Sequence, residues 1–186
     1  MHEFKEHYIY DEAFEGKEMA DLRRSDPARY QRSRRERTAS SQRRVAEAVA
    51  GFANARGGWL YIGVRDGGSV CGPGKDPEYG GFENYPGKLA DHMTGSLSRY
   101  LRNESFIRSN IRMTFKEFGG RTVCIIRVTM SNRQIYVHPS DKKEMFLARG
   151  PGARGKRLEG TERDDYIMGR FGWSSRGLRE MAGTRA

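Results

Sequence analysis

The sequence predicts an α/β domain of the α+β type, with helices packed on one mixed, mostly antiparallel sheet. Two hairpin signals favour antiparallel strands: Asp66-Gly67-Gly68 follows an apolar run, and Gly119-Gly120 separates two others. Apolar residues at helical spacing favour helices at 42–56 and 87–102. A chain of 186 residues has the length of a single domain with extensions.

The N-terminal quarter is expected to hold a first strand at 3–9, helix-forming residues at 11–22 and a basic insertion at 23–44. This arginine-rich insertion carries nine arginines, against Asp26 and Glu36. We interpret it as a phosphate-contacting arm, because the planar guanidinium suits phosphate, while a solvated helix or loop is the alternative. Its candidate nucleic-acid ligands are Arg32, Arg34, Arg35, Arg37, Arg43 and Arg44.

The central run from Val45 to Gly72 predicts a helix, a strand and a tight turn. Gly57-Gly58 is expected to end the helix, since glycine adopts the left-handed conformation at little cost. Residues 59–64 then have strand propensity. This order places Asp66 at the end of a strand, where a functional carboxylate is often found, although aspartate before glycine is also a common turn former.

The second half is expected to be built from short strands and two helices after a glycine- and proline-rich loop at 72–87. Alternation and turn residues predict strands at 111–116, 121–128, 135–137 and 145–147 and a helix at 162–170. We expect this domain to cover residues 1–172, with a basic tail at 173–186. The expected core consists of Phe52, Leu60, Ile62, Val64, Leu89, Met93, Ile126 and Val128.

The net charge of +10 favours a polyanionic partner, RNA or DNA, with an anionic membrane surface as the rival. No apolar run approaches 18 residues, so no transmembrane helix is expected. Nucleic acid rather than a membrane is the expected partner. Cys71 and Cys124 lie in expected strands and make no CxxC pair, which favours a reducing, cytoplasmic location and disfavours zinc. The glycine run at 150–155 lacks a GK[ST] ending, so no nucleotide cofactor is expected.

The central run resembles the Schlafen-type, AlbA-like DNA-binding domain, through Phe52-Ala53-Asn54, Gly57-Gly58 and the run from Ile62 to Asp66. Glu3-Phe4-Lys5 is similar to the upstream strand of that family, and the run from Phe146 to Gly150 to its closing strand and turn. The resemblance implies a Schlafen core-like fold with nucleic acid as partner. Asn54 on its own is interpreted as a local cap at the helix end rather than a reader of bases.

In nuclease members of the family, three acidic residues gather a divalent metal. Glu3 and Asp66 match two of them, which implies Mg²⁺ or Mn²⁺ as cofactor and a metal-activated water that attacks a phosphodiester. The first carboxylate would fall before Met1, so Glu6 or another acidic residue would have to replace it. Lys5 shares a strand face with Glu3, where it would steady a phosphate or pair with Glu3.

Three functions remain open at this point. The first is nucleic-acid binding through phosphate contacts, to which a second basic patch of Arg149, Arg154, Lys156 and Arg157 would contribute. The second is a metal-dependent endonuclease, acting on RNA, tRNA-like substrates or DNA, with Glu3, Asp66 and Lys5 as catalytic residues. The third is a non-catalytic subunit or regulator that forms a homo-oligomer or docks on a protein partner.

Overall fold

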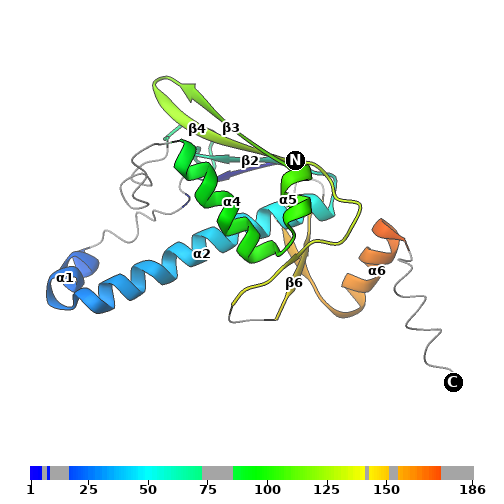
Figure 1. The fold of residues 1–186 in the computed structure, drawn as a ribbon, viewed down its shortest axis with the longest axis horizontal. Coiled ribbons are helices and arrows are strands. Elements are labelled where there is room, and N and C mark those ends of the chain that lie inside the picture. The colour runs from blue at the N-terminus through cyan, green and yellow to red at the C-terminus, as the bar shows by residue number, and fades with distance from the viewer. Residues whose placement is uncertain (6–7, 9–16, 73–85, 141–142, 151–154, 173–186) are drawn as a thin grey trace.

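The computed structural model describes residues 1–5, 8, 17–72, 86–140, 143–150 and 155–172. Its central feature is a four-stranded sheet with two helices on one side (Figure 1). In spatial order the strands are β1 (His2–Lys5), β2 (Gly58–Ile62), β4 (Arg121–Val128) and β3 (Ile111–Phe118), and the two helices are α2 (Pro27–Asn54) and α4 (Gly87–Leu101). Since β1 pairs with β2 in parallel and the other pairs are antiparallel, the sheet is mixed as expected.

A second, three-stranded antiparallel sheet lies beyond the C-terminal part of α2. Its strands are β5 (Tyr136–Val137), β6 (Met145–Ala148) and β7 (Lys156–Leu158). The remaining helices are α1 (Lys17–Ser25), α5 (Glu104–Asn110) and α6 (Gly160–Phe171). The strands expected at 135–137 and 145–147 correspond to β5 and β6, but their place in a separate second sheet was not predicted. The elements β7 and α5 were not predicted either, because they are short and lack a clear apolar period. No helix among the described residues is long and apolar enough to span a membrane.

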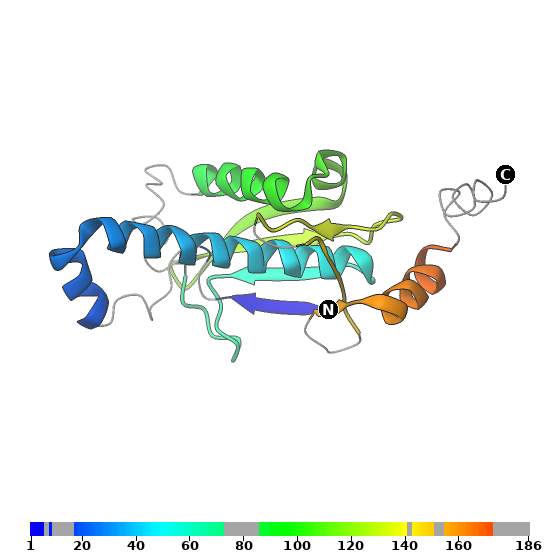
Figure 2. The same cartoon turned by 90° about the horizontal axis from the view of Figure 1, so that it is seen from below.

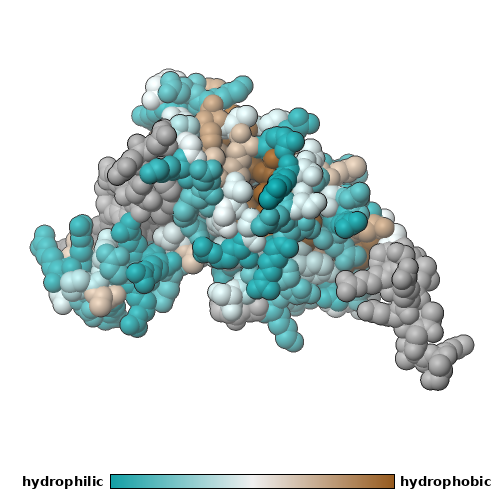
Figure 3. Space-filling view, in the orientation of Figure 1, coloured by the Kyte–Doolittle hydropathy of each residue, from teal (hydrophilic) through white to brown (hydrophobic). Residues whose placement is uncertain are grey.

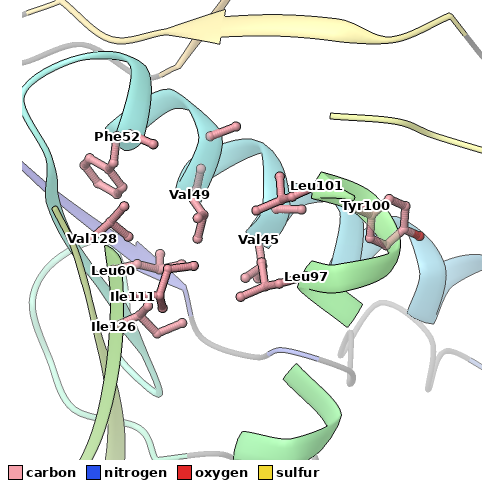
Figure 4. Close-up of a cluster of buried hydrophobic side chains, with 14 of the residues drawn as sticks. Val45, Val49, Phe52, Leu60, Leu97, Tyr100, Leu101, Ile111, Ile126 and Val128 are labelled. Carbon is pink, nitrogen blue, oxygen red and sulfur yellow. The ribbon is translucent and has the colours of Figure 1, made fainter. Parts of the chain in front are cut away.

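The main core lies between α2, α4 and the four-stranded sheet. Figure 4 shows Val45, Val49 and Phe52 of α2 directed towards strand residues and towards α4. All eight residues expected in the core are at most 5% exposed, which confirms the predicted helix and strand faces. Val64 is the exception in position, since it joins a small separate cluster on the opposite face of the sheet.

The long helix α2 differs most from the sequence-based expectation. It begins at Pro27, capped by Asp26, whose carboxylate accepts a 2.9 Å hydrogen bond from the Arg29 amide. It then continues for 28 residues, about 42 Å. Its arginine-rich half extends past the end of the sheet (Figures 1 and 2). The expected boundary between an arm at 23–44 and a helix at 42–56 is therefore wrong, because arginine is a good helix former and nothing interrupts the helix.

Other boundaries shift by a few residues. Of the strand expected at 3–9 the structure describes β1 at His2–Lys5, and of the helix expected at 11–22 it describes α1 at Lys17–Ser25, while residues 6–7 lie outside the described residues. Residues 9–16 and the tail at 173–186 lie outside the described residues. The helices and strands expected at 87–102, 121–128 and 145–147 match α4, β4 and β6 within one residue.

Candidate nucleic-acid interface

Two glycines let the central helix–strand unit fold tightly. A Cβ on Gly58 would lie 2.2 Å from the Phe52 ring, so only glycine lets β2 start against the helix. Gly63 has φ +92°, and its Cβ would lie 2.9 Å from the backbone of Gly72. Its carbonyl accepts hydrogen bonds from the amides of Cys71 and Gly72, which closes a hairpin over 63–72.

Asn54 joins the end of α2 to segments far along the chain. The side chain is fully buried and donates 2.8 Å hydrogen bonds to the carbonyls of Ile135 and Leu147, while its Oδ1 accepts from the Ile135 amide. The expectation of a local cap was wrong, because these partners are 81 and 93 residues away. A buried amide satisfied on three sides leaves no atom for reading bases.

The first and last motifs of the family resemblance meet in one buried ion pair. Glu3 pairs with the Arg149 guanidinium, which is also 4.1 Å from the Phe52 ring centroid, and with Lys5 at 2.8 Å. Burial lowers the pKa of Arg149 below its usual range. The Arg149 side chain lies against Gly51 of α2, where an added Cβ would be 3.4 Å from Arg149 Cγ, an ordinary packing distance.

This geometry assigns structural roles to three candidate site residues. The Arg149 side chain is 4% exposed and pairs with Glu3, so a phosphate contact by Arg149 stays a prediction that would require this ion pair to open. Lys5 takes the alternative left open by the sequence, which was pairing with Glu3. The Glu3 carboxylate is held by two cations, so it stabilises the junction of β1 with the end of β6.

Asp66 lies in the exposed tip of the hairpin. Glu3 stands opposite Leu60 in the strand register. Asp66 follows Leu60 by six positions, which is at most about 20 Å along an extended strand. The register pairs Glu3 with Leu60 and does not by itself place the two carboxylates side by side. No group of three His, Cys, Asp or Glu side chains suited to a metal occurs within the described ranges, from which Glu6 is excluded. A shared Mg²⁺ or Mn²⁺ at Glu3 and Asp66 stays a prediction.

The basic half of α2 presents its arginines to different degrees. Arg32, Arg35 and Arg44 are exposed, and none of them pairs with a carboxylate of the described residues. Arg34 and Arg37 are half-buried and have partners, and Arg43 pairs with Glu47 at 3.3 Å. In Figure 3 the lobe at the left, formed by α1 and the start of α2, is predominantly hydrophilic. This part of α2 is a cationic surface that projects from the body.

The second expected basic patch is neutralised where the structure describes it. Lys156 pairs with Glu162 at 2.5 Å, and Arg157 pairs with Glu159 at 2.6 Å. Arg154 lies outside the described residues. A phosphate contact by Lys156 or Arg157 stays a prediction that would require competition with these carboxylates.

The sheet face turned away from α2 and α4 carries a row that the sequence reading missed. The strand register places His2, Trp59, Arg127 and Arg112 side by side across the four strands. Trp59 is 36% exposed, and the Arg127 guanidinium lies 5.5 Å from its ring centroid. The available signal was the alternation of Trp59 and Tyr61 with the buried Leu60 and Ile62, in a run that the sequence identified only as a strand.

The same face becomes apolar towards the 63–72 hairpin. The next row is Phe4, Tyr61, Ile125 and Thr114, and the Phe4 and Tyr61 rings lie 5.4 Å apart. Val64 and Val123 are buried there, with Val70 packed against them. The exposed end of the face therefore combines aromatic rings with basic side chains, and its covered end supports the hairpin.

The described residues thus form an α+β domain with one cationic helix and one sheet face that carries aromatic and basic side chains. The family model for Schlafen, AlbA_2 matches residues 28–155, which is more than half of the sequence, and the chain belongs to this family. The matched range begins within the arginine-rich segment and includes Arg32 to Arg44. Family membership supports a nucleic-acid-related role for the chain.

Comparison with solved structures supports the fold. The chain is similar to the DIP2311 protein of Corynebacterium diphtheriae, with a TM-score of 0.50 and 20% identity over 73% of this chain. It spans only 23% of that protein. The N-terminal domain of a RecG-related protein of Nitrosomonas europaea, described as an ATP-dependent DNA helicase, is 21% identical over 63% of this chain and 77% of that domain. Its TM-score of 0.29 is too low to carry an argument. No curated protein matches the chain.

Proposed function

We propose that this domain binds nucleic acid mainly through phosphate contacts made by the exposed arginines of α2. The observation that carries the proposal is the projecting half of that helix. From Pro27 to Arg44 it contains seven arginines and a single acidic residue, Glu36. A backbone of phosphates is the polyanion that such a surface fits, because its charges are evenly spaced and each contact releases counterions.

The second basic patch, formed by Arg149, Lys156 and Arg157, supports phosphate binding less well than α2 does. Arg149, Lys156 and Arg157 all pair with carboxylates. Arg32, Arg35 and Arg44 have no such partner among the described residues, so their charge is available to a ligand. Contacts of this kind position a nucleic acid without reading its sequence. RNA and DNA are both expected ligands, and binding is expected to be largely independent of nucleotide sequence.

The test is a triple substitution, Arg32→Gln, Arg35→Gln and Arg44→Gln, measured by fluorescence anisotropy on RNA and DNA at several salt concentrations. Each lost phosphate contact should reduce the slope of log affinity against log salt by about 0.7–0.9. We therefore expect weaker binding to all sequences and a slope smaller by roughly 2–3.

The matched control removes the same charge from paired residues: Lys156→Gln, Arg157→Gln and Arg163→Gln. These side chains are paired with Glu162, Glu159 and Asp164. The control protein should keep nearly the parental slope. Equal slopes for the α2 variant and its parent would overturn the proposal, and an oligomer or docked protein partner would then explain the cationic helix.

A further inference from the structure

We infer that the open face of the four-stranded sheet is a stacking site for single-stranded nucleic acid, centred on Trp59 and Tyr61. This inference rests on the proposed function and adds the substrate class: unpaired RNA or DNA rather than a duplex. The observations that support it lie on the sheet face opposite the helices, and α2 contributes no side chain to that face.

The first argument is the kind of side chain that the register collects. Trp59 lies between His2 and Arg127, and one row further along Tyr61 lies next to Phe4. The His2 and Tyr61 rings are 5.8 Å apart, so the aromatic groups of the two rows are in contact. Flat rings presented on neighbouring strands offer platforms on which successive bases stack, whatever their sequence.

The second argument is charge. The side chains that alternate outwards in the row of Trp59 include Arg112 and Arg127, both of them exposed. No carboxylate of the described strands shares this face, because Glu3 and Glu117 alternate to the other side. Rings flanked by cations match a strand of bases joined by phosphates, whereas they would repel a basic protein surface.

The third argument is access. Trp59 is 36% exposed, an unusual position for a large ring in a central strand. It pairs with β1 on one side and β4 on the other, so its backbone is satisfied and its ring is not needed to close the main core. A duplex cannot present its bases to such a platform, because they are stacked and paired inside the helix.

The chain has two tryptophans, Trp59 and Trp173, and the test uses a Trp173→Phe background so that only Trp59 contributes tryptophan fluorescence. Addition of a single strand of about 20 nucleotides, as oligo(dT) or oligo(U), should quench Trp59 fluorescence, and a blunt duplex of the same length should not. Trp59→Ala should weaken single-strand binding about fivefold to 150-fold, with duplex binding unchanged. Trp59→Phe should restore most of the loss.

Phe118→Ala is the matched control, since Phe118 is exposed on the same face but six residues from Arg112 along β3, about 20 Å away. It should leave single-strand binding unchanged. The inference is overturned if Trp59 fluorescence does not respond to the single strand, or if Trp59→Ala weakens duplex and single strand equally. A homodimer detected by light scattering and dissociated by Trp59→Ala would overturn it as well.

Failure of this inference is distinguishable from failure of the proposed function. If Trp59→Ala has no effect while the triple arginine variant weakens binding, the phosphate-binding helix stands without the stacking site. If the parent protein binds neither strands nor duplexes, both are wrong.

Discussion

At the scale of single residues, the family motif is mostly a set of packing requirements. Gly58 makes room for Phe52, and Asn54 bonds to two distant backbone segments. The sequence could indicate that these residue types recur in a family, but it could not indicate their partners. Glu3 and Arg149 are 146 positions apart, so only the folded chain shows that they form one ion pair.

Asn54→Ala should be strongly destabilising. The substitution leaves the Ile135 amide and the carbonyls of Ile135 and Leu147 without their partner in a fully buried site. Each such group costs about 1–3 kcal/mol, so we expect a loss of roughly 3 kcal/mol or more in the free energy of unfolding, measured by urea denaturation. Asn110→Ala is the control, because Asn110 also donates through its amide but in an exposed setting. Equal losses would show that Asn54 is not the link we describe.

At the scale of elements, the sequence predicted the helix faces that touch the core and missed the parts that do not. The apolar period of Val45, Val49 and Phe52 located the buried half of α2, whereas the half before Arg43 has no apolar stripe. The signal that remained was local, an Asp-Pro pair at a helix start. The open sheet face was missed for another reason: which strands are neighbours decides which side chains share a row, and spacing alone does not give the order β1-β2-β4-β3.

Phe52→Ala tests whether α2 is anchored in the core as described. The Phe52 side chain is fully buried, and its ring contacts the Arg149 guanidinium. Truncation of a buried aromatic ring usually costs about 3–5 kcal/mol, and we expect a loss in that range by urea denaturation. Phe118→Ala, which removes a ring that is 48% exposed, should change stability by less than about 1 kcal/mol. A similarly small loss for Phe52→Ala would mean that the helix does not depend on this contact.

At the scale of the whole molecule, the two proposed surfaces are held at a fixed distance by one helix. Arg35 precedes Phe52 by 17 residues on α2, about 25 Å. Phe52 packs against Gly58, the residue before Trp59, so the stacking face begins near the far end of that helix. A stacked strand advances about 3.4 Å per nucleotide, so at least about seven nucleotides are needed for the interval along the helix, and more to reach the face of the sheet turned away from it.

This spacing predicts a dependence on strand length. Affinity for oligo(dT) or oligo(U) should rise steeply between about 4 and about 15 nucleotides, because a longer strand engages both surfaces and the second contact becomes intramolecular. Either Trp59→Ala or the triple substitution of Arg32, Arg35 and Arg44 should abolish most of that rise, since each removes one of the two contacts. The measurement is anisotropy over a series of labelled strands at constant salt. A rise that persists in both variants would show that the two surfaces do not bind one strand, and that each acts on a separate ligand.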